Sequence, residues 1–89
     1  MLRVAPHSFA WIRVPTAAYY LLRIYRGRTL IFVAEPRTNR IVLPSAWTFA
    51  GRTHRLASGR YRWSVRPGFG PPSAKRYGRE IVRAALVVQ

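Results

Sequence analysis

The chain has 89 residues, which is enough for one hydrophobic core and excludes a second domain of ordinary size. Hydrophobic residues make up 49% of it, too many for a disordered chain, and the lack of cysteine excludes disulfides and thiolate metal sites. The formal net charge is +14, so the charge favours polyanions as partners. All the basic residues except Lys75 are Arg, an excess that codon usage in a GC-rich genome would also produce.

Apolar residues that alternate with period two, between Pro and Gly breakers, predict six strands. They are expected at residues 8–14, 19–26, 29–34, 40–43, 60–66 and 85–88. The link Gly27-Arg28 fits a two-residue hairpin turn of type II′, with Gly at its first central position. Residues 45–55 are expected to be irregular and residues 67–72 to form a loop. The pattern predicts a single all-β domain over residues 1–89.

No segment of the sequence is apolar enough to span a membrane, because Arg interrupts every apolar stretch well before about 18 residues. Residues 1–11 also lack the apolar core of a signal peptide. We therefore expect either a cytoplasmic protein or a processed or partial piece of a longer chain.

The segment LASGRYRWSV, from Leu56 to Val65, resembles the L-x-P-G-x-Y-x-W-x-V segment of fibronectin type III modules. The resemblance implies an immunoglobulin-like fold, an antiparallel two-sheet sandwich in which Tyr61 and Trp63 belong to strand F. It assigns the predicted strands, in chain order, to B, C, C′, E, F and G. Strand A is missing or reduced to residues 2–5, and the interval from Leu56 to Tyr61 is one residue shorter than usual. A small half-open barrel of the same strands is the alternative fold.

The match is closest to the Arg-rich modules of this type in predicted secreted actinobacterial proteins. The resemblance therefore implies a location outside the cell or in the cell envelope, with the cytoplasm as the alternative.

Groups that could perform catalysis are few. Glu35 and Glu80 are the only carboxylate side chains, and His7 and His54 are the only imidazoles. In the sandwich nothing brings the two Glu residues to the separation that a glycosidase needs. Two His residues without a third ligand do not make a zinc site. We expect a protein that is not an enzyme and that uses no metal or cofactor.

Strands C and F are neighbours in the implied sandwich, so their outward residues form a candidate basic and aromatic binding face. Its members are Tyr19, Arg23, Tyr25, Arg60, Arg62 and Arg66. Guanidinium groups stack on aromatic rings and pair with phosphate, sulfate or carboxylate through two hydrogen bonds. The alternative is that these are ordinary solvated strand positions, since any chain of this charge must expose Arg.

The connection 67–80 is a second candidate, either a binding loop or a Pro/Gly-rich connector. Its candidate residues are Phe69, Lys75, Arg76, Tyr77 and Arg79. Trp47 and Phe49 are expected to form a lid over the open end of the core.

Together these features predict a non-catalytic interaction or spacer module of a larger extracytoplasmic protein, with a protein or an anionic polymer as partner. The alternative is a small basic β-domain that binds nucleic acid, with Tyr rings stacking on bases.

Overall fold

The computed structural model describes residues 7–88, which form an all-β fold of antiparallel sheets with no α-helix in that range. The strands are β1 (His7–Ala10), β2 (Tyr19–Arg26), β3 (Thr29–Ala34), β4 (Arg40–Leu43), β5 (Ala46–Phe49), β6 (Arg52–Arg55), β7 (Gly59–Phe69), β8 (Arg76–Tyr77) and β9 (Val82–Val88). A single 3₁₀ turn covers Pro72–Ala74.

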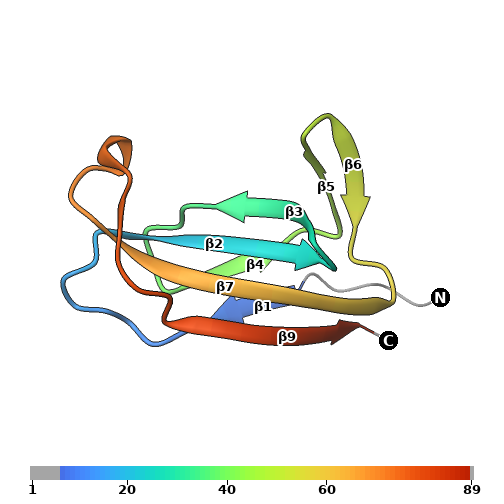
Figure 1. Ribbon diagram of the computed structural model, residues 1–89, viewed down its shortest axis with the longest axis horizontal. Helices are drawn as coiled ribbons and strands as arrows, with labels where there is room; N and C mark the ends of the chain where they lie inside the picture. Colours follow the sequence, from blue (N-terminus) through green and yellow to red (C-terminus); the bar gives the residue numbers. More distant parts are fainter. Residues whose placement is uncertain (1–6, 89) are drawn as a thin grey trace.

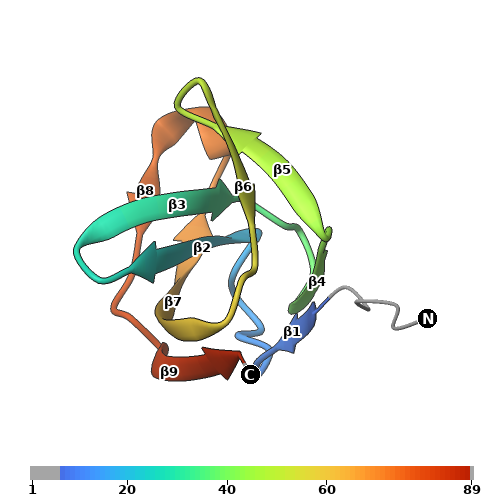
Figure 2. The ribbon, with the colours of Figure 1, turned by 90° about the vertical axis from the view of Figure 1, so that its right-hand side faces the viewer.

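The largest sheet has the order β3-β2-β7, and both β8 and β9 pair with the free side of β7. β9 runs along the first part of β7, and β8 pairs with its end at Gly68 and Phe69. The two-stranded sheet β1-β4 lies against one face of this sheet, which we call the inner face (Figure 1). The hairpin β5-β6 projects from one end of the molecule (Figure 2).

The core lies between the two sheets because alternate residues of the central strands point to the inner face. Its buried members are Phe9, Trp11, Tyr20, Leu22, Ile24, Ile31, Leu43, Leu56, Tyr61 and Val65. The rings of Phe9 and Trp63 meet edge to face at 5.0 Å, and those of Trp11 and Tyr20 at 5.4 Å. Each such buried side chain stabilises the fold by about 1.5–3 kcal/mol, so this packing holds β1 and β4 on the larger sheet.

Three predicted strands, β2, β3 and β4, have the bounds that the alternation predicts. The turn between β2 and β3 also agrees with its predicted type. Gly27 has φ = +61° and Arg28 does not have a positive φ, the signs that a type II′ turn requires.

The prediction that residues 45–55 are irregular is wrong, because they form the hairpin β5-β6 around Ala50 and Gly51. Both residues have positive φ, +52° and +77°, as in a type I′ turn. Alanine is rare at such a position, so the usual Asn-Gly or Asp-Gly signal is missing from the sequence.

Three predicted boundaries are also wrong. The first strand ends at Ala10 instead of at residue 14, and the last begins at Val82 instead of at residue 85. β7 continues to Phe69, into the predicted loop, because Gly68 and Phe69 find strand partners on β8. These partners come from distant residues that local alternation does not reveal.

Trp47 covers the core as predicted. Its indole nitrogen donates a 2.7 Å hydrogen bond to the carbonyl oxygen of Ile31, and its ring meets Phe32 edge to face at 5.7 Å. Phe49 instead lies 6.5 Å from the imidazole of His54, away from the buried cluster. One residue of the predicted pair therefore forms the lid.

Candidate functional site

The outer face of the largest sheet, opposite the core, carries a row of Arg residues. Arg62 of β7 lies between Tyr25 of β2 and Ala85 of β9 in the strand register. Two residues further along β7, Ser64 lies between Arg23 and Arg83. Adjacent strands are about 4.8 Å apart, so the two rows bring these guanidinium groups onto one surface.

The same surface continues along β7. Arg60 lies opposite Val87, and Arg66 lies opposite Leu21. Along β7, Arg60 and Arg62 are two residues apart, about 7 Å, and Arg62 and Arg66 are four residues apart, about 13 Å. We call the following set the arginine face: Arg23, Tyr25, Arg28, Arg60, Arg62, Arg66 and Arg83.

Two shallow clefts flank Arg62. One, of about 400 Å³, also has Tyr25, Arg28, Arg83 and the carboxylate-bearing Glu80 in its lining. The other, of about 560 Å³, has Arg28 and Arg60. Arg62 and Arg28 line both clefts, so a bound anion in either would be within reach of the same two guanidinium groups.

Sequence reasoning missed Arg28 and Arg83. Arg28 occupies the β2-β3 turn, and Arg83 reaches the face only because β9 pairs with β7 in this register. The alternation of Arg83, Ala85 and Val87 on the outer side of β9 is the signal that could have identified Arg83. This signal is visible only if the strand is taken to begin at Val82 instead of residue 85.

Little carboxylate lies on the arginine face. In the range 7–88, the ion pairs join Lys75 to Glu35 at 3.1 Å and Arg83 to Glu80 at 2.7 Å. Glu80, which lines the first cleft, therefore neutralises Arg83. Arg60, Arg62 and Arg66 have no carboxylate partner in that range, and their exposed guanidinium groups are free to meet an external anion.

Tyr19 was predicted to belong to this face, and it does not, because its side chain is fully buried. The strand register places Gly68 between Tyr19 and Tyr77. Since Gly68 has no side chain, the two rings meet above it, 5.9 Å apart and edge to face. The arginine face therefore begins beyond this covered end of β2.

The second candidate, the connection 67–80, does not present its five residues as one surface. Lys75 and Tyr77 are tied to Glu35: the Lys75 ammonium lies 3.1 Å from the carboxylate, and the Tyr77 hydroxyl donates a 2.5 Å hydrogen bond to it. The hydrogen bond from Tyr77, followed by that from Lys75, lowers the pKa of Glu35. The same bond raises the pKa of Tyr77. Phe69 is half-buried, while Arg76 and Arg79 remain exposed.

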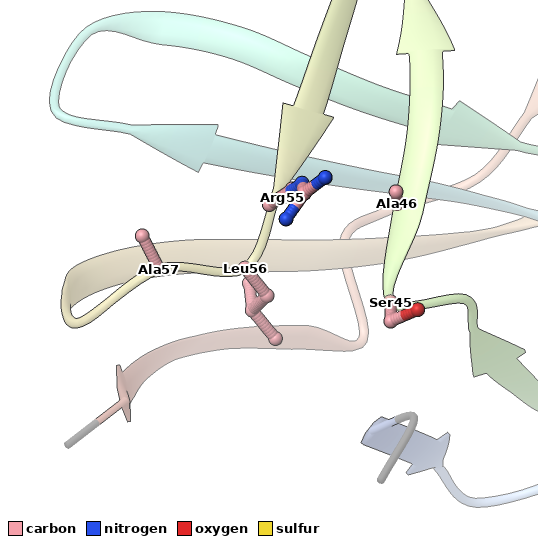
Figure 3. Close-up of a pocket in the computed structure, with 5 residues that line it drawn as sticks. All are labelled: Ser45, Ala46, Arg55, Leu56 and Ala57. Carbon is pink, nitrogen blue, oxygen red and sulfur yellow. The ribbon is translucent and has the colours of Figure 1, made fainter. Parts of the chain in front are cut away.

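The described residues contain no group of three His, Asp or Glu side chains that could hold a metal ion. A cleft of about 490 Å³ lies at the base of the β5-β6 hairpin (Figure 3) and is lined by Ser45, Ala46, Arg55, Leu56 and Ala57. Its lining includes neither an imidazole nor a carboxylate that could activate Ser45 as a nucleophile. In residues 7–88 no helix has the length and apolar character needed to cross a membrane.

No protein-family model, no curated protein and no solved structure matches this chain.

Proposed function

We propose that this chain is a non-catalytic binding module whose arginine face holds an anionic polysaccharide. The observation that carries the proposal is the placement of Arg60, Arg62 and Arg66 along one strand, exposed and without carboxylate partners in residues 7–88. Guanidinium groups pair with sulfate and carboxylate through two hydrogen bonds each. A row of them offers a polymer several contacts at once.

We further propose that the fold is a fibronectin type III-like sandwich, part of a larger protein outside the cell or in its envelope. Two features support it. The order β3-β2-β7-β9, facing β1-β4, is the order that C′-C-F-G facing B-E would have. Tyr61, near the start of β7, bonds through its hydroxyl to the backbone of Ala57, as the tyrosine corner of such sandwiches does.

Nucleic acid is the less supported partner. Single-strand binders combine basic grooves with several aromatic rings on which bases stack. With Tyr19 buried, Tyr25 is the one ring of the arginine face, and it is half-buried. The surface therefore favours recognition by charge over recognition by stacking.

The test is a titration of the protein with fluorescently labelled heparin at several salt concentrations. The double variant Arg62→Gln, Arg66→Gln removes two charges from the arginine face. Its matched control, Arg52→Gln, Arg55→Gln, removes two exposed charges from β6. We expect the first pair of substitutions to weaken binding about tenfold. The logarithm of the association constant falls as the logarithm of the salt concentration rises, and the magnitude of this slope is expected to decrease by about two.

The control pair is expected to change the affinity by less than about twofold. Equal losses in the two pairs would show that only net charge matters, and the arginine face would then not be a site. A deoxythymidine oligomer that binds more tightly than heparin, and loses affinity in Tyr25→Ala, would favour nucleic acid instead.

A further inference from the structure

The small sheet has an open edge. Among residues 7–88, β1 pairs only with β4. The amide of Trp11 donates to the carbonyl of Asn39 at 3.1 Å, which orients the backbone of Trp11 toward β4. Because backbone groups alternate in direction along an antiparallel strand, those of Ser8 and Ala10 point to the open side. They are available to pair with an added strand.

β9 is the neighbouring edge of the largest sheet, and it pairs only with β7 in the described range. The edges of β1 and β9 lie on the same side of the molecule (Figures 1 and 2). Between them is a cleft of about 440 Å³, lined entirely by apolar residues: Ala10, Trp11, Ile12, Val14, Trp63, Ile81 and Val82.

Two apolar side chains of the cleft are exposed to solvent. Ile12 is 85% exposed and Ile81 40% exposed, one on each side of it. Trp11 is only 7% exposed, yet its indole nitrogen finds no acceptor within residues 7–88. Buried indole donors usually have a partner, and this nitrogen is left without one among the described residues.

We propose that this cleft binds an extended acidic peptide segment of another protein, which adds a strand to β1. Its alternate apolar side chains would enter the cleft, and its backbone would pair with Ser8 and Ala10. This surface is distinct from the arginine face, so the inference goes beyond the proposed function.

Charge decides the identity of the occupant. Arg13 stands in the chain between Ile12 and Val14, which both line the cleft, and the chain carries a net charge of +14. Both Glu35 and Glu80 are already engaged with cations. A second copy would therefore bring like charge to like charge, and residues 1–6 contain Arg3 but no acid. An acidic partner strand complements this edge, since like charges repel and opposite charges attract.

The experiment uses a fluorescein-labelled peptide of about ten residues in which valine and glutamate alternate, long enough to span an edge strand of ordinary length. A control peptide has the same composition with the valines and glutamates in two blocks. Fluorescence anisotropy is measured at about 0.3 M salt, where binding by charge alone is weak. We expect the alternating peptide to bind at least about tenfold more tightly. Equal affinities would overturn the proposal.

Two variants test whether the peptide binds along β1. Ala10→Pro removes an amide hydrogen from the open side and is compatible with an edge strand. Ile12→Glu introduces a charge on an exposed side chain, so it tests the site even if the proline variant does not fold. Each is expected to weaken binding about tenfold. The matched control is Val42→Glu on β4. Val42 is 56% exposed and does not line the cleft, so this substitution is expected to change the peptide affinity by less than about twofold.

Two further measurements test the other occupants. Removal of residues 1–6 is expected to leave peptide affinity unchanged, and an increase of about tenfold would assign the cleft to the chain's own N-terminal segment. Sedimentation is expected to show monomers, and a dimer dissociated by Ile12→Glu would assign it to a second copy. Either result overturns the proposal. The variant Arg62→Gln, Arg66→Gln is expected to bind the peptide normally, so failure of the arginine face leaves this test intact.

Discussion

The hydroxyl of Tyr61 donates a 2.7 Å hydrogen bond to the carbonyl oxygen of Ala57, four residues upstream. The Tyr61 ring is buried in the core, and the Arg26 guanidinium lies 5.7 Å from its centroid. The bond therefore ties the segment that leads into β7 to the core. The short interval from Leu56 to Tyr61 does not prevent it.

Replacing Tyr61 with Phe keeps the ring and removes the donor. The carbonyl of Ala57 would lose its partner, so we expect the free energy of unfolding to fall by about 1–2 kcal/mol. Urea denaturation followed by tryptophan fluorescence measures the change. Tyr25→Phe, on the half-buried Tyr of the arginine face, is the control and is expected to alter stability by less than about 0.5 kcal/mol. Equal effects would mean that the hydrogen bond contributes nothing specific.

Gly68 is required by the ring beside it. A Cβ at this position would lie 2.5 and 2.6 Å from the Cε2 and Cε1 atoms of Tyr19, which is fully buried. Gly68→Ala is therefore expected to destabilise the fold by about 1–3 kcal/mol. In a Tyr19→Leu background the ring is absent, and the same substitution is expected to cost clearly less. Identical costs in the two backgrounds, measured by denaturation in a double-mutant cycle, would exclude the clash as the cause.

The sequence predicts the strands that carry a regular alternation between strong breakers, such as β2, which ends at Gly27. It does not predict pairing that depends on distant residues. β7 extends to Phe69 because β8 lies beside it, and Tyr19 is buried because the register places Gly68 next to it. Arg23, Arg60, Arg62 and Arg66 were predictable because the strands expected at residues 19–26 and 60–66 form and pair. Arg28 lies in a turn, and Arg83 required the register of β9.

The cluster of Glu35, Tyr77 and Lys75 makes stability depend on pH at both ends of the scale. The pKa of Glu35 is lowered from its usual 4.5 in the folded state, so its contribution is complete above that pH and is lost as the pH falls further. The pKa of Tyr77 is raised from its usual 10.0, so its contribution is complete below pH 10 and is lost as the pH rises through the raised value.

Chemical denaturation measured from about pH 5 to pH 3 is expected to show a loss of stability in the native chain, and Glu35→Gln is expected to reduce it. Glu80→Gln is the control and should leave this loss in place. Tyr77→Phe is expected to weaken both the acidic and the alkaline dependence. An acid dependence unchanged by Glu35→Gln would show that the cluster does not stabilise the fold.

Ala50 is strained in the turn of the β5-β6 hairpin, because it has φ = +52°, where a side chain is unfavourable. Glycine takes this conformation readily, so Ala50→Gly is expected to raise the free energy of unfolding by about 0.5–1 kcal/mol. The matched control is Ala46→Gly in β5, where glycine loses conformational freedom without relieving strain, and a decrease of about the same size is expected. Thermal denaturation of both variants measures the difference. A decrease in both would mean that Ala50 is not strained, since only a residue held at positive φ gains from the loss of its Cβ.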